Sequence, residues 1–317
     1  MNANARQAAP SPQAPSVDKR ERVTAAGLPE APTSSGLWRI AAARLWRSSS
    51  GRNGLLIVLL MVLVAIFAPL IAPDPPLELS PREQFRAPSW DHPFGTDEFG
   101  RDLLSRVIYG SRISLIAGGG AVLLAALVGV TLGMLAGYFR GVTEAILARL
   151  FDLILAFPAV LLAIAAIAIL GRSTQSAVIA IGLINVPAFA RLARASVLTE
   201  AEKEYVEAER SLGAGHWHIL LRTLLPNVLP SVMVLASVAM ASAILLEASL
   251  SFLGLGTQPP SPSWGNMVSA GRTYLRNAEW YGVFPGLMIV VLILGLNLLG
   301  DGLRDALDPR GGKKRTG

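Results

Sequence analysis

The stretch that decides the fold runs from Ile113 to Tyr138 and reads ISLIAGGGAVLLAALVGVTLGMLAGY, without one charged side chain. A helix needs about 20 predominantly apolar residues to cross the hydrocarbon core of a bilayer. This stretch therefore predicts a membrane-spanning helix. Gly129, Gly133 and Gly137 recur at a spacing of four, so they share a helix face that a second helix can approach closely. We interpret this face as a packing seam within a helix bundle rather than as the lining of a pore.

Five other stretches have a similar length and apolar character. Pro158 and Pro187 fall inside two of them, and proline kinks a helix because it lacks the backbone N–H donor. A bundle can satisfy the freed groups from neighbouring helices. The sequence thus predicts an all-α polytopic membrane protein with about six transmembrane helices, over residues 55–72, 113–138, 145–170, 177–198, 228–246 and 283–299.

The composition of the whole chain agrees with a membrane protein. Of its 317 residues, 52% are hydrophobic and only 16% are charged, whereas a soluble domain carries about 25% charged residues. A disordered chain, a collagen-like chain and an ordinary globular enzyme are therefore excluded. Cysteine is absent, so a disulfide framework, a zinc–thiolate site and a thiol nucleophile are excluded as well.

The two ends of the chain differ from its apolar middle. Residues 1–36 are rich in Ala, Pro, Ser and charge, which predicts a disordered cytoplasmic tail. We expect residues 37–54 to form a basic lead-in at the membrane surface and residues 311–317 to form a basic cytoplasmic tail. The transmembrane domain is expected over residues 55–310.

The distribution of Lys and Arg predicts the orientation of the chain. If the N-terminus lies inside, 20 of the 28 basic residues fall on the inner side of the predicted spans and 8 fall on the outer side. Loops that carry more Lys and Arg stay in the cytoplasm. We therefore expect a multi-pass protein with both termini on the cytoplasmic side.

The loop over residues 199–227, between the fourth and fifth predicted spans, is the most informative polar segment. Thr199 and Glu202 match a capping box, which predicts a helix start. Gly213 is expected to end this helix, because glycine adopts the left-handed conformation at low cost. A second short helix is expected from about Gly215. The resulting bent helix pair fits a groove on a partner protein, or it merely connects two spans.

Within this loop, Glu207-Ala208-Glu209, Gly213 and Thr223-Leu224-Leu225-Pro226 stand in an order that resembles the EAA loop of ABC-importer permeases. The resemblance implies that the segment is a coupling helix that inserts into a cleft on the ATPase subunit. The chain departs from the family pattern at Glu209, which replaces alanine, and at Thr223, where many members have an aliphatic residue. The residues expected to couple to the ATPase are Glu207, Ala208, Gly213, Trp217, Leu225 and Pro226.

Three further blocks extend this resemblance over about residues 50–310. Residues 92–106, residues 249–267 and the pair of segments 284–287 and 297–309 resemble corresponding blocks of peptide and nickel permeases. The match is closest to the C-type subunit of dipeptide and oligopeptide importers. It implies the type I ABC-importer permease fold and binding-protein-dependent peptide transport across a bacterial inner membrane.

The same resemblance implies the partners of the chain. They are a second homologous permease, two ATP-binding subunits, a periplasmic or lipid-anchored substrate-binding protein, and membrane lipid, with no nucleic acid. The two permeases would enclose the translocation path between them. The substrate stays open among dipeptides, oligopeptides, glutathione and nickel complexes, because importers of all four share these blocks.

The chain is not expected to be an enzyme. Of its lysines only Lys313 follows a glycine, and Leu307 stands where a P-loop requires the earlier glycine. ATP must therefore be used by partner subunits, and we expect no catalytic residue, no metal site and no cofactor bound by this chain.

The alternative is a self-sufficient secondary transporter, which would need intramembrane ionisable residues and usually an internal repeat. The sequence has few such residues and no clear repeat.

A few polar residues stand out near the ends of the predicted spans. Glu247 closes the fifth span, where it is either a glutamate at the outer surface or, with Asn185, a gate or path residue. A charged cluster precedes the second span on the outer side and consists of Arg101, Asp102, Arg106 and Arg112. It is read as a salt-bridged surface helix or as a docking site for the binding protein. The residues expected at such a docking site are Arg101, Asp102, Arg106 and Trp264.

Overall fold

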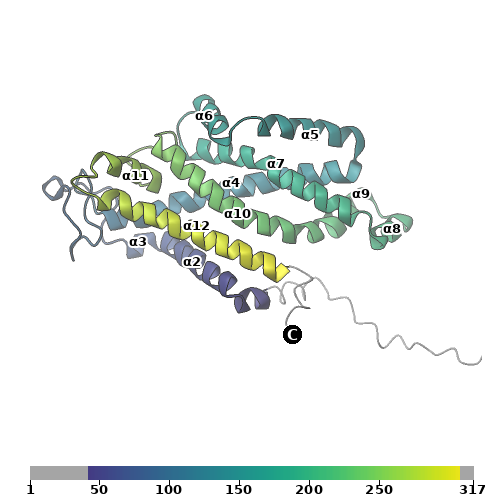
Figure 1. Ribbon diagram of the computed structural model, residues 1–317, viewed down its shortest axis with the longest axis horizontal. Coiled ribbons are helices and arrows are strands. Elements are labelled where there is room, and N and C mark those ends of the chain that lie inside the picture. The colour runs from purple at the N-terminus through teal and green to yellow at the C-terminus, as the bar shows by residue number, and fades with distance from the viewer. Residues whose placement is uncertain (1–41, 308–317) are drawn as a thin grey trace, which may run out of the picture. The chain divides into compact units, whose positions relative to one another are not determined.

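The computed structural model describes residues 42–307, which form a bundle of α-helices (Figure 1). The predicted tails over residues 1–36 and 311–317, and the first residues of the predicted lead-in, lie outside the described residues. Within the described part, β-type pairing is confined to an isolated bridge between Thr96 and Asp102.

The helices follow one another with short connections, apart from two longer segments before α4 and before α11. In chain order they are α2 (Ser49–Ile66), α3 (Ala68–Ile71), η2 (Pro81–Glu83), α4 (Leu103–Phe139), α5 (Gly141–Leu155), α6 (Ala159–Leu170), α7 (Thr174–Glu200), α8 (Glu204–Ser211), α9 (His216–His218), the π-helix η3 (Ile219–Leu224), α10 (Leu225–Phe252), α11 (Trp264–Thr273) and α12 (Trp280–Leu307).

Five helical runs are long and apolar enough to cross a membrane. They are α2, α4, α7, the continuous run His216–Phe252 and α12. α5 and α6 pass the same test only as a bent pair, which would bring the number to six. The predicted all-α polytopic fold is confirmed.

The third predicted span, over residues 145–170, is wrong as a single helix. α5 ends at Leu155, α6 begins at Ala159, and the two helices meet at an angle of 93°. Pro158 occupies the N-cap position of α6. Proline lacks the N–H that would continue the α5 hydrogen bonds, and it disfavours a helical backbone at the residue before it. The expected kink is therefore a complete break.

The second predicted span begins earlier than expected, because α4 starts at Leu103 instead of near Ile113. Its first turns include Ser105 and Arg106, which a hydropathy criterion excludes from a lipid-facing helix. In the structure both side chains are buried by protein. The polar start of α4 is thus covered by other parts of the chain.

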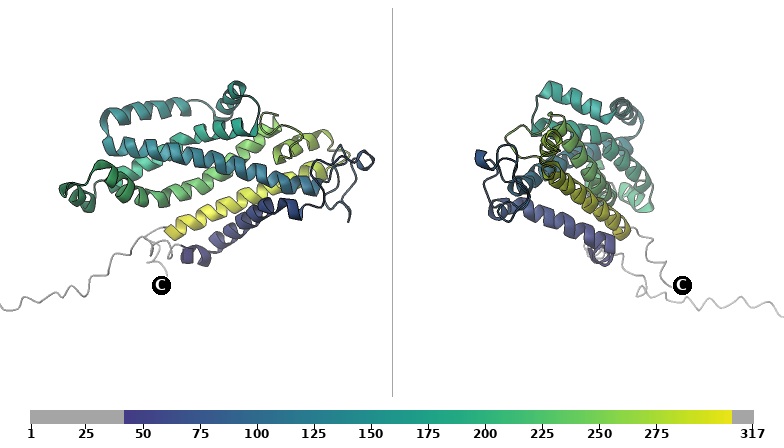
Figure 2. Two further views of the ribbon diagram at one scale, coloured as in Figure 1. Left: turned by 180° about the vertical axis from the view of Figure 1, so that it is seen from behind. Right: turned by 60° about the vertical axis from the view of Figure 1, so that its left-hand side comes forward.

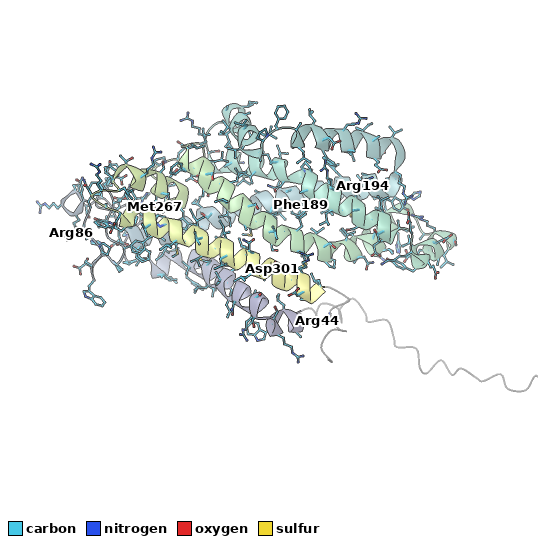
Figure 3. All side chains as sticks on the ribbon, in the orientation of Figure 1. Arg44, Arg86, Phe189, Arg194, Met267 and Asp301 are labelled. Atoms are coloured by element: carbon cyan, nitrogen blue, oxygen red, sulfur yellow. The ribbon has the colours of Figure 1, made fainter. Side chains whose placement is uncertain are left out.

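α4 and α7 pack against each other along the glycine seam. A Cβ atom added to Gly133 would lie 2.2 Å from the carbonyl oxygen of Ala190, and one added to Gly129 would lie 2.6 Å from that of Val186. Phe189 of α7 is fully buried beside this contact, inside the bundle (Figure 3). The interpretation of the glycine pattern as a packing seam is confirmed.

α2 and α12 lie side by side, as two views of the ribbon show (Figures 1 and 2). A Cβ added to Gly54 would lie 2.3 Å from the backbone nitrogen of Leu299, and one added to Gly302 would lie 2.2 Å from the Cα of Gly51. Such close backbone contact requires residues without side chains. The first and last described spans therefore form one tight pair.

The two ends of the bundle carry different polar segments (Figure 1). α8 and α9 lie at one end, which we call the α8 end. α11 and residues 72–102 lie at the opposite end, which we call the α11 end. α4, α7 and α10 run between the two ends, so a displacement at one end can reach the other end through these helices.

Candidate functional site

The segment that contains α8 and α9 folds as a bent helix pair. α8 ends at Ser211, and Gly213 follows with φ of +83°. The N–H of Gly213 donates to the carbonyl of Arg210 and the N–H of Ala214 donates to that of Glu209, each at 3.0 Å. This left-handed glycine closes the helix in the usual way. The predicted stop at Gly213 and the second short helix from Gly215 are confirmed.

The predicted start of this helix pair is wrong. Thr199 lies within α7, where its hydroxyl donates to the carbonyl of Ala195 at 3.1 Å, so it caps no new helix. Glu202 instead pairs with Arg140, with 2.9 Å between Nη2 and Oε1. α7 continues to Glu200 because its apolar face stays buried through Val197. The tertiary packing of α7 therefore outweighs the local capping signal.

Buried side chains anchor this segment to the bundle. Val206 of α8 and Ile219, Leu220 and Leu224 of η3 are all buried and belong to the main hydrophobic core. A polar contact adds to them, because the hydroxyl of Tyr138 at the end of α4 lies 3.0 Å from Nδ1 of His216. These contacts attach the segment to the bundle at the α8 end.

The opposite face of the same segment is exposed. Leu212 is 87% exposed and Trp217 is 64% exposed. Of the residues expected to couple to an ATPase, Leu225 is half-buried, and the exposed ones are Glu207, Ala208, Gly213, Trp217 and Pro226. Apolar side chains on a protruding helix pair are available to a groove on another protein.

A polar cavity of about 750 Å³ lies beside α8. Charged side chains of both signs line it, and the guanidinium carbon of Arg210 lies 5.4 Å from the ring centroid of Tyr138. The lining residues are Gly137, Tyr138, Arg140, Ala201, Glu202, Glu207, Arg210 and Ser211. The cavity is thus bordered by both α8 and the end of α4.

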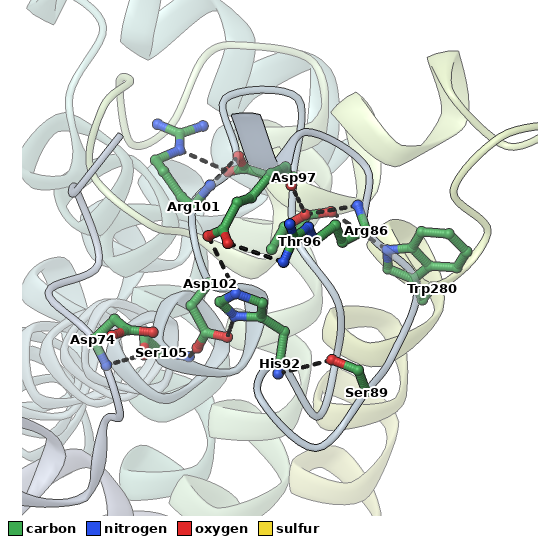
Figure 4. Close-up of polar contacts among 11 residues, drawn as sticks. Asp74, Arg86, Ser89, His92, Thr96, Asp97, Arg101, Asp102, Ser105 and Trp280 are labelled. Carbon is green, nitrogen blue, oxygen red and sulfur yellow. Dashed lines mark hydrogen bonds and ion pairs between the residues drawn. The ribbon is translucent and has the colours of Figure 1, made fainter. Parts of the chain in front are cut away.

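A buried charge cluster holds the α11 end together (Figure 4). Oδ2 of Asp97 lies 2.6 Å from Nε of Arg101 and 3.3 Å from Nε of Arg106. Asp102 caps α4, since its Oδ2 accepts a hydrogen bond from the N–H of Ser105 at 2.7 Å. Nη1 of Arg106 also donates to the carbonyl of Pro76 at 3.0 Å. The cluster therefore ties residues 72–102 to the start of α4.

The charged cluster expected on the outer side is buried instead of exposed. Arg101 is 6% exposed and Arg106 is 5% exposed, and Asp102 and Trp264 are also buried. The expected salt bridges are present, but the cluster does not form a surface helix. Its role in docking a binding protein stays a prediction.

His92 is a member of this cluster that sequence reasoning missed. Its Nδ1 lies 3.0 Å from Oδ1 of Asp102, and its Nε2 lies 3.4 Å from Oε2 of Glu83. Burial disfavours the charged ring, but the hydrogen bond and charge of Asp102 and the charge of Glu83 together raise the pKa of His92 above 6.5. The contact between His92 and Asp102 has no signature in the sequence, because it joins a loop residue to a helix cap.

His92 and Asp102 also stand close to Asp74, with one potential ligand atom from each residue within 4.8 Å of the others. These groups could hold a divalent cation by type and distance. In the structure, however, His92 and Asp102 bind each other, and Asp102 also caps α4. Their hydrogen bonds account for the arrangement without an ion.

Glu247 lies inside the bundle instead of at the surface, so the surface reading is wrong. It is fully buried, and its Oε1 accepts a hydrogen bond from the hydroxyl of Ser251 at 2.7 Å. Oε2 of Glu247 has no hydrogen-bond partner among the described residues. Asn185 donates from Nδ2 to the carbonyl of Ile181, one turn back, at 2.8 Å. The gate or path role of both residues stays a prediction.

Two ion pairs join the broken helix pair to α7. Nη2 of Arg191 lies 2.7 Å from Oδ1 of Asp152, and Arg194 pairs with Glu144. Figure 3 shows Arg194 on α7, closer to the α8 end than Phe189. The two arginines bind acidic residues of α5 from one side of α7, so α5 is tied to α7 near the α8 end.

Comparisons with known proteins identify the class to which this architecture belongs. The family described as binding-protein-dependent transport system inner membrane component matches residues 129–312. A second model, the N-terminal TM domain of oligopeptide transport permease C, matches residues 36–88. The chain therefore belongs to the family of inner membrane components of binding-protein-dependent transport systems.

Individual relatives refine this assignment. A dipeptide transport system permease protein DppC from Alkalihalophilus pseudofirmus is 45% identical over 86% of this chain and 90% of its own length. A di/tripeptide transport system permease protein DppC from Pseudomonas aeruginosa is 46% identical over 81% and 87%. A glutathione transport system permease protein GsiD from Pectobacterium atrosepticum is 42% identical over 86% and 91%. The expected resemblance to C-type ABC-importer permeases is confirmed.

A solved structure of the MetNI methionine ABC transporter, in an inward-facing conformation, shares the fold. The TM-score is 0.51 at 17% identity, over 64% of this chain and 97% of that chain. The chain is thus a multi-pass ABC-importer permease, and permeases of this kind work with ATPases and a substrate-binding protein.

Proposed function

We propose that the chain is a permease subunit of an ATP-driven peptide importer and that its α8–α9 segment couples it to the ATPases. The observation that carries the proposal is the helix pair at the α8 end, anchored by Val206 and Leu220 and exposed at Leu212 and Trp217. Relatives named as dipeptide and di/tripeptide permeases support a peptide substrate. A glutathione permease among the relatives supports glutathione, itself a short peptide, as the second candidate.

In this proposal the translocation path lies between this chain and a second, homologous permease. α5 and α6 support that arrangement, because they carry large apolar side chains that the described part of the chain leaves exposed, among them Ile146, Leu153, Leu161 and Ile169. Lipid or a second permease helix would cover such a surface. Two ATP-binding subunits would bind the α8 end, and a substrate-binding protein would bind the α11 end.

The orientation follows from the same reasoning. We place the α8 end and both termini in the cytoplasm, and the α11 end outside the bacterial inner membrane. The excess of Lys and Arg on the inner side supports this placement. The chain itself would neither hydrolyse ATP nor bind a cofactor; ATP would be used by its partners.

The first test is a pull-down of the tagged chain from native membranes in mild detergent. We expect a second permease, two P-loop ATPases and a binding protein, whose bound ligand identifies the substrate. Recovery of the chain alone, in detergent that preserves such complexes, would favour a self-sufficient secondary transporter.

The second test is the variant Gly213→Pro, which removes the N–H and the positive φ that end α8. We expect normal membrane insertion but loss of the link between ATP hydrolysis and peptide uptake. Gly171→Pro is the matched control, because Gly171 has φ of +87°, also donates its N–H within a helix end, and lies in the α6–α7 connection. Normal peptide uptake by Gly213→Pro would contradict the coupling role.

A further inference from the structure

A chain of hydrogen bonds links the coupling segment to two long helices. The hydroxyl of Thr223 donates to Oε2 of Glu209 at 2.7 Å, and Nδ2 of Asn227 donates to the carbonyl of Thr223 at 2.7 Å. Nδ2 of Asn227 also lies 3.4 Å from the hydroxyl of Tyr205, which donates to Oε2 of Glu200 at 2.7 Å. This series of hydrogen bonds therefore connects α7, α8, η3 and α10.

The hydrogen bond between Thr223 and Glu209, in the middle of this series, is partly buried. Thr223 is 8% exposed, and Glu209 is half-buried. This hydrogen bond, at 2.7 Å, joins the side chain of Glu209 on α8 directly to η3, which leads into α10.

The hydroxyl of Tyr205 keeps its proton. Burial, the hydrogen bond to Glu200 and the charges of Glu200 and Glu209 raise the pKa of Tyr205 above its usual range. The phenol therefore stays neutral and can donate to Glu200 at any physiological pH. Loss of the Tyr205 proton therefore does not break this series of hydrogen bonds at physiological pH.

Thr223 lies in a π-helix, which sits between α9 and α10. π-helical turns are rare, and they occur frequently at functional sites. Rewinding η3 to an α-helix would shift the register of hydrogen bonds and move Thr223 away from Glu209. The bond between Thr223 and Glu209 is therefore made in the π-helical arrangement of η3.

We infer that Glu209 and Thr223 are positioning residues that pass a displacement of α8 to η3 and α10. This inference rests on the proposed coupling role of α8. Both residues depart from the pattern of the family that the chain resembles, and they are each other's hydrogen-bond partners in the structure. The pair would therefore be a feature of this chain that replaces apolar packing at the same place.

The test is Thr223→Val in the complete complex, measured as ATP hydrolysed per peptide imported in proteoliposomes. Valine keeps the volume and branching of threonine but removes the hydroxyl. We expect this ratio to rise about fivefold or more, the lower end of measured coupling between linked sites. The thermal unfolding temperature and the yield of co-purified ATPases should stay unchanged. If the Thr223 hydroxyl served only to stabilise the fold, its loss would lower one of these two quantities.

Two further variants sharpen the result. Glu209→Ala should raise the ratio by a similar factor, and the double variant Glu209→Ala/Thr223→Val should be no worse than either single variant, because the two residues act through one bond. Thr131→Val is the matched control: its hydroxyl donates to the carbonyl of Leu127 within α4, at 2.6 Å, and the change should leave the ratio unaltered.

The inference is overturned if Thr223→Val leaves the ratio unchanged or if the effects of the two single variants multiply in the double variant. Failure of the proposed function would look different. In that case the unaltered chain would not bring ATPases with it, or Gly213→Pro would import peptide normally.

Discussion

The indole N–H of Trp264 donates to the backbone carbonyl of Val107 at 2.9 Å, and this bond joins the first turn of α11 to α4. Both residues are buried. Gly110, one turn further along α4, makes room for the ring, since a Cβ there would lie 2.7 Å from Cδ1 of Trp264. Trp264 therefore ties α11 to α4, while Gly265 packs α11 against α10 and Gly271 packs it against α12.

Trp264→Phe should destabilise the α11 end. It removes the donor to Val107 and leaves part of the tryptophan site empty, and both effects together cost about 2 to 4 kcal/mol. Thermal unfolding of the purified protein in detergent measures the loss. Trp90→Phe is the control, because Trp90 is fully exposed and should change the unfolding temperature little. Equal effects of the two variants would contradict the assignment.

Gly133→Ala should loosen the pair of α4 and α7. The new methyl group would meet the carbonyl oxygen of Ala190 at 2.2 Å, and backbone atoms cannot yield without moving a helix. Overpacking of this kind costs about 1 to 3 kcal/mol or more. Gly119→Ala in the same helix has its nearest neighbour, Cε of Met240, at 3.8 Å. We expect that variant to be neutral or slightly stabilising in the same unfolding measurement.

Asp97→Asn should be among the most harmful single changes at the α11 end. It removes the charge between Arg101 and Arg106, both of which are buried. An uncompensated buried charge costs about 3 to 5 kcal/mol. Glu202→Gln breaks the exposed pair with Arg140 and should cost under about 1 kcal/mol. If chemical denaturation gives similar losses for the two variants, the buried cluster does not stabilise the fold.

The segment around His92 should lose stability as the pH rises. The folded-state pKa of His92 lies above 6.5, so the protonated ring stabilises the contacts with Asp102 and Glu83. This contribution is fully present below the unfolded pKa of about 6.5 and is lost as the pH rises through the folded pKa. Hydrogen exchange of residues 83–102 from pH 5.5 to pH 9 measures it.

His92→Gln should remove this pH dependence, whereas His218→Gln, at an exposed position, should retain it. A pH dependence that persists unchanged in His92→Gln would assign the effect to another group.

Much of the fold could be predicted from the sequence. Long apolar runs mark the spans because a bilayer demands about 20 such residues. Gly133 and its neighbours mark the α4–α7 contact because four-residue spacing puts small residues on one face. Gly213 marks the end of α8 because its left-handed conformation is a local property of the backbone. Each of these signals is contained in a short stretch of chain.

The features that could not be predicted depend on distant partners. The sequence predicts Arg106 in a charged cluster at the outer surface, yet its partners Asp97 and Pro76 come from a preceding segment that contacts and buries its side chain. Thr199 offers a capping signal that the packing of α7 overrides. Glu247 is fully buried in α10, against which α11 packs closely at Gly265. Tertiary contacts decide all three cases.

The pairing of α2 with α12 also determines the order in which the chain can assemble during its synthesis. Gly51 and Gly54 have Gly302 and Leu299 as their neighbours, and the ribosome makes these residues after all the other described helices. The α2 helix must therefore wait in the lipid with its glycine face uncovered until α12 has been made. A chain that stops before α12 keeps this face open, which distinguishes an unfinished product from a finished one.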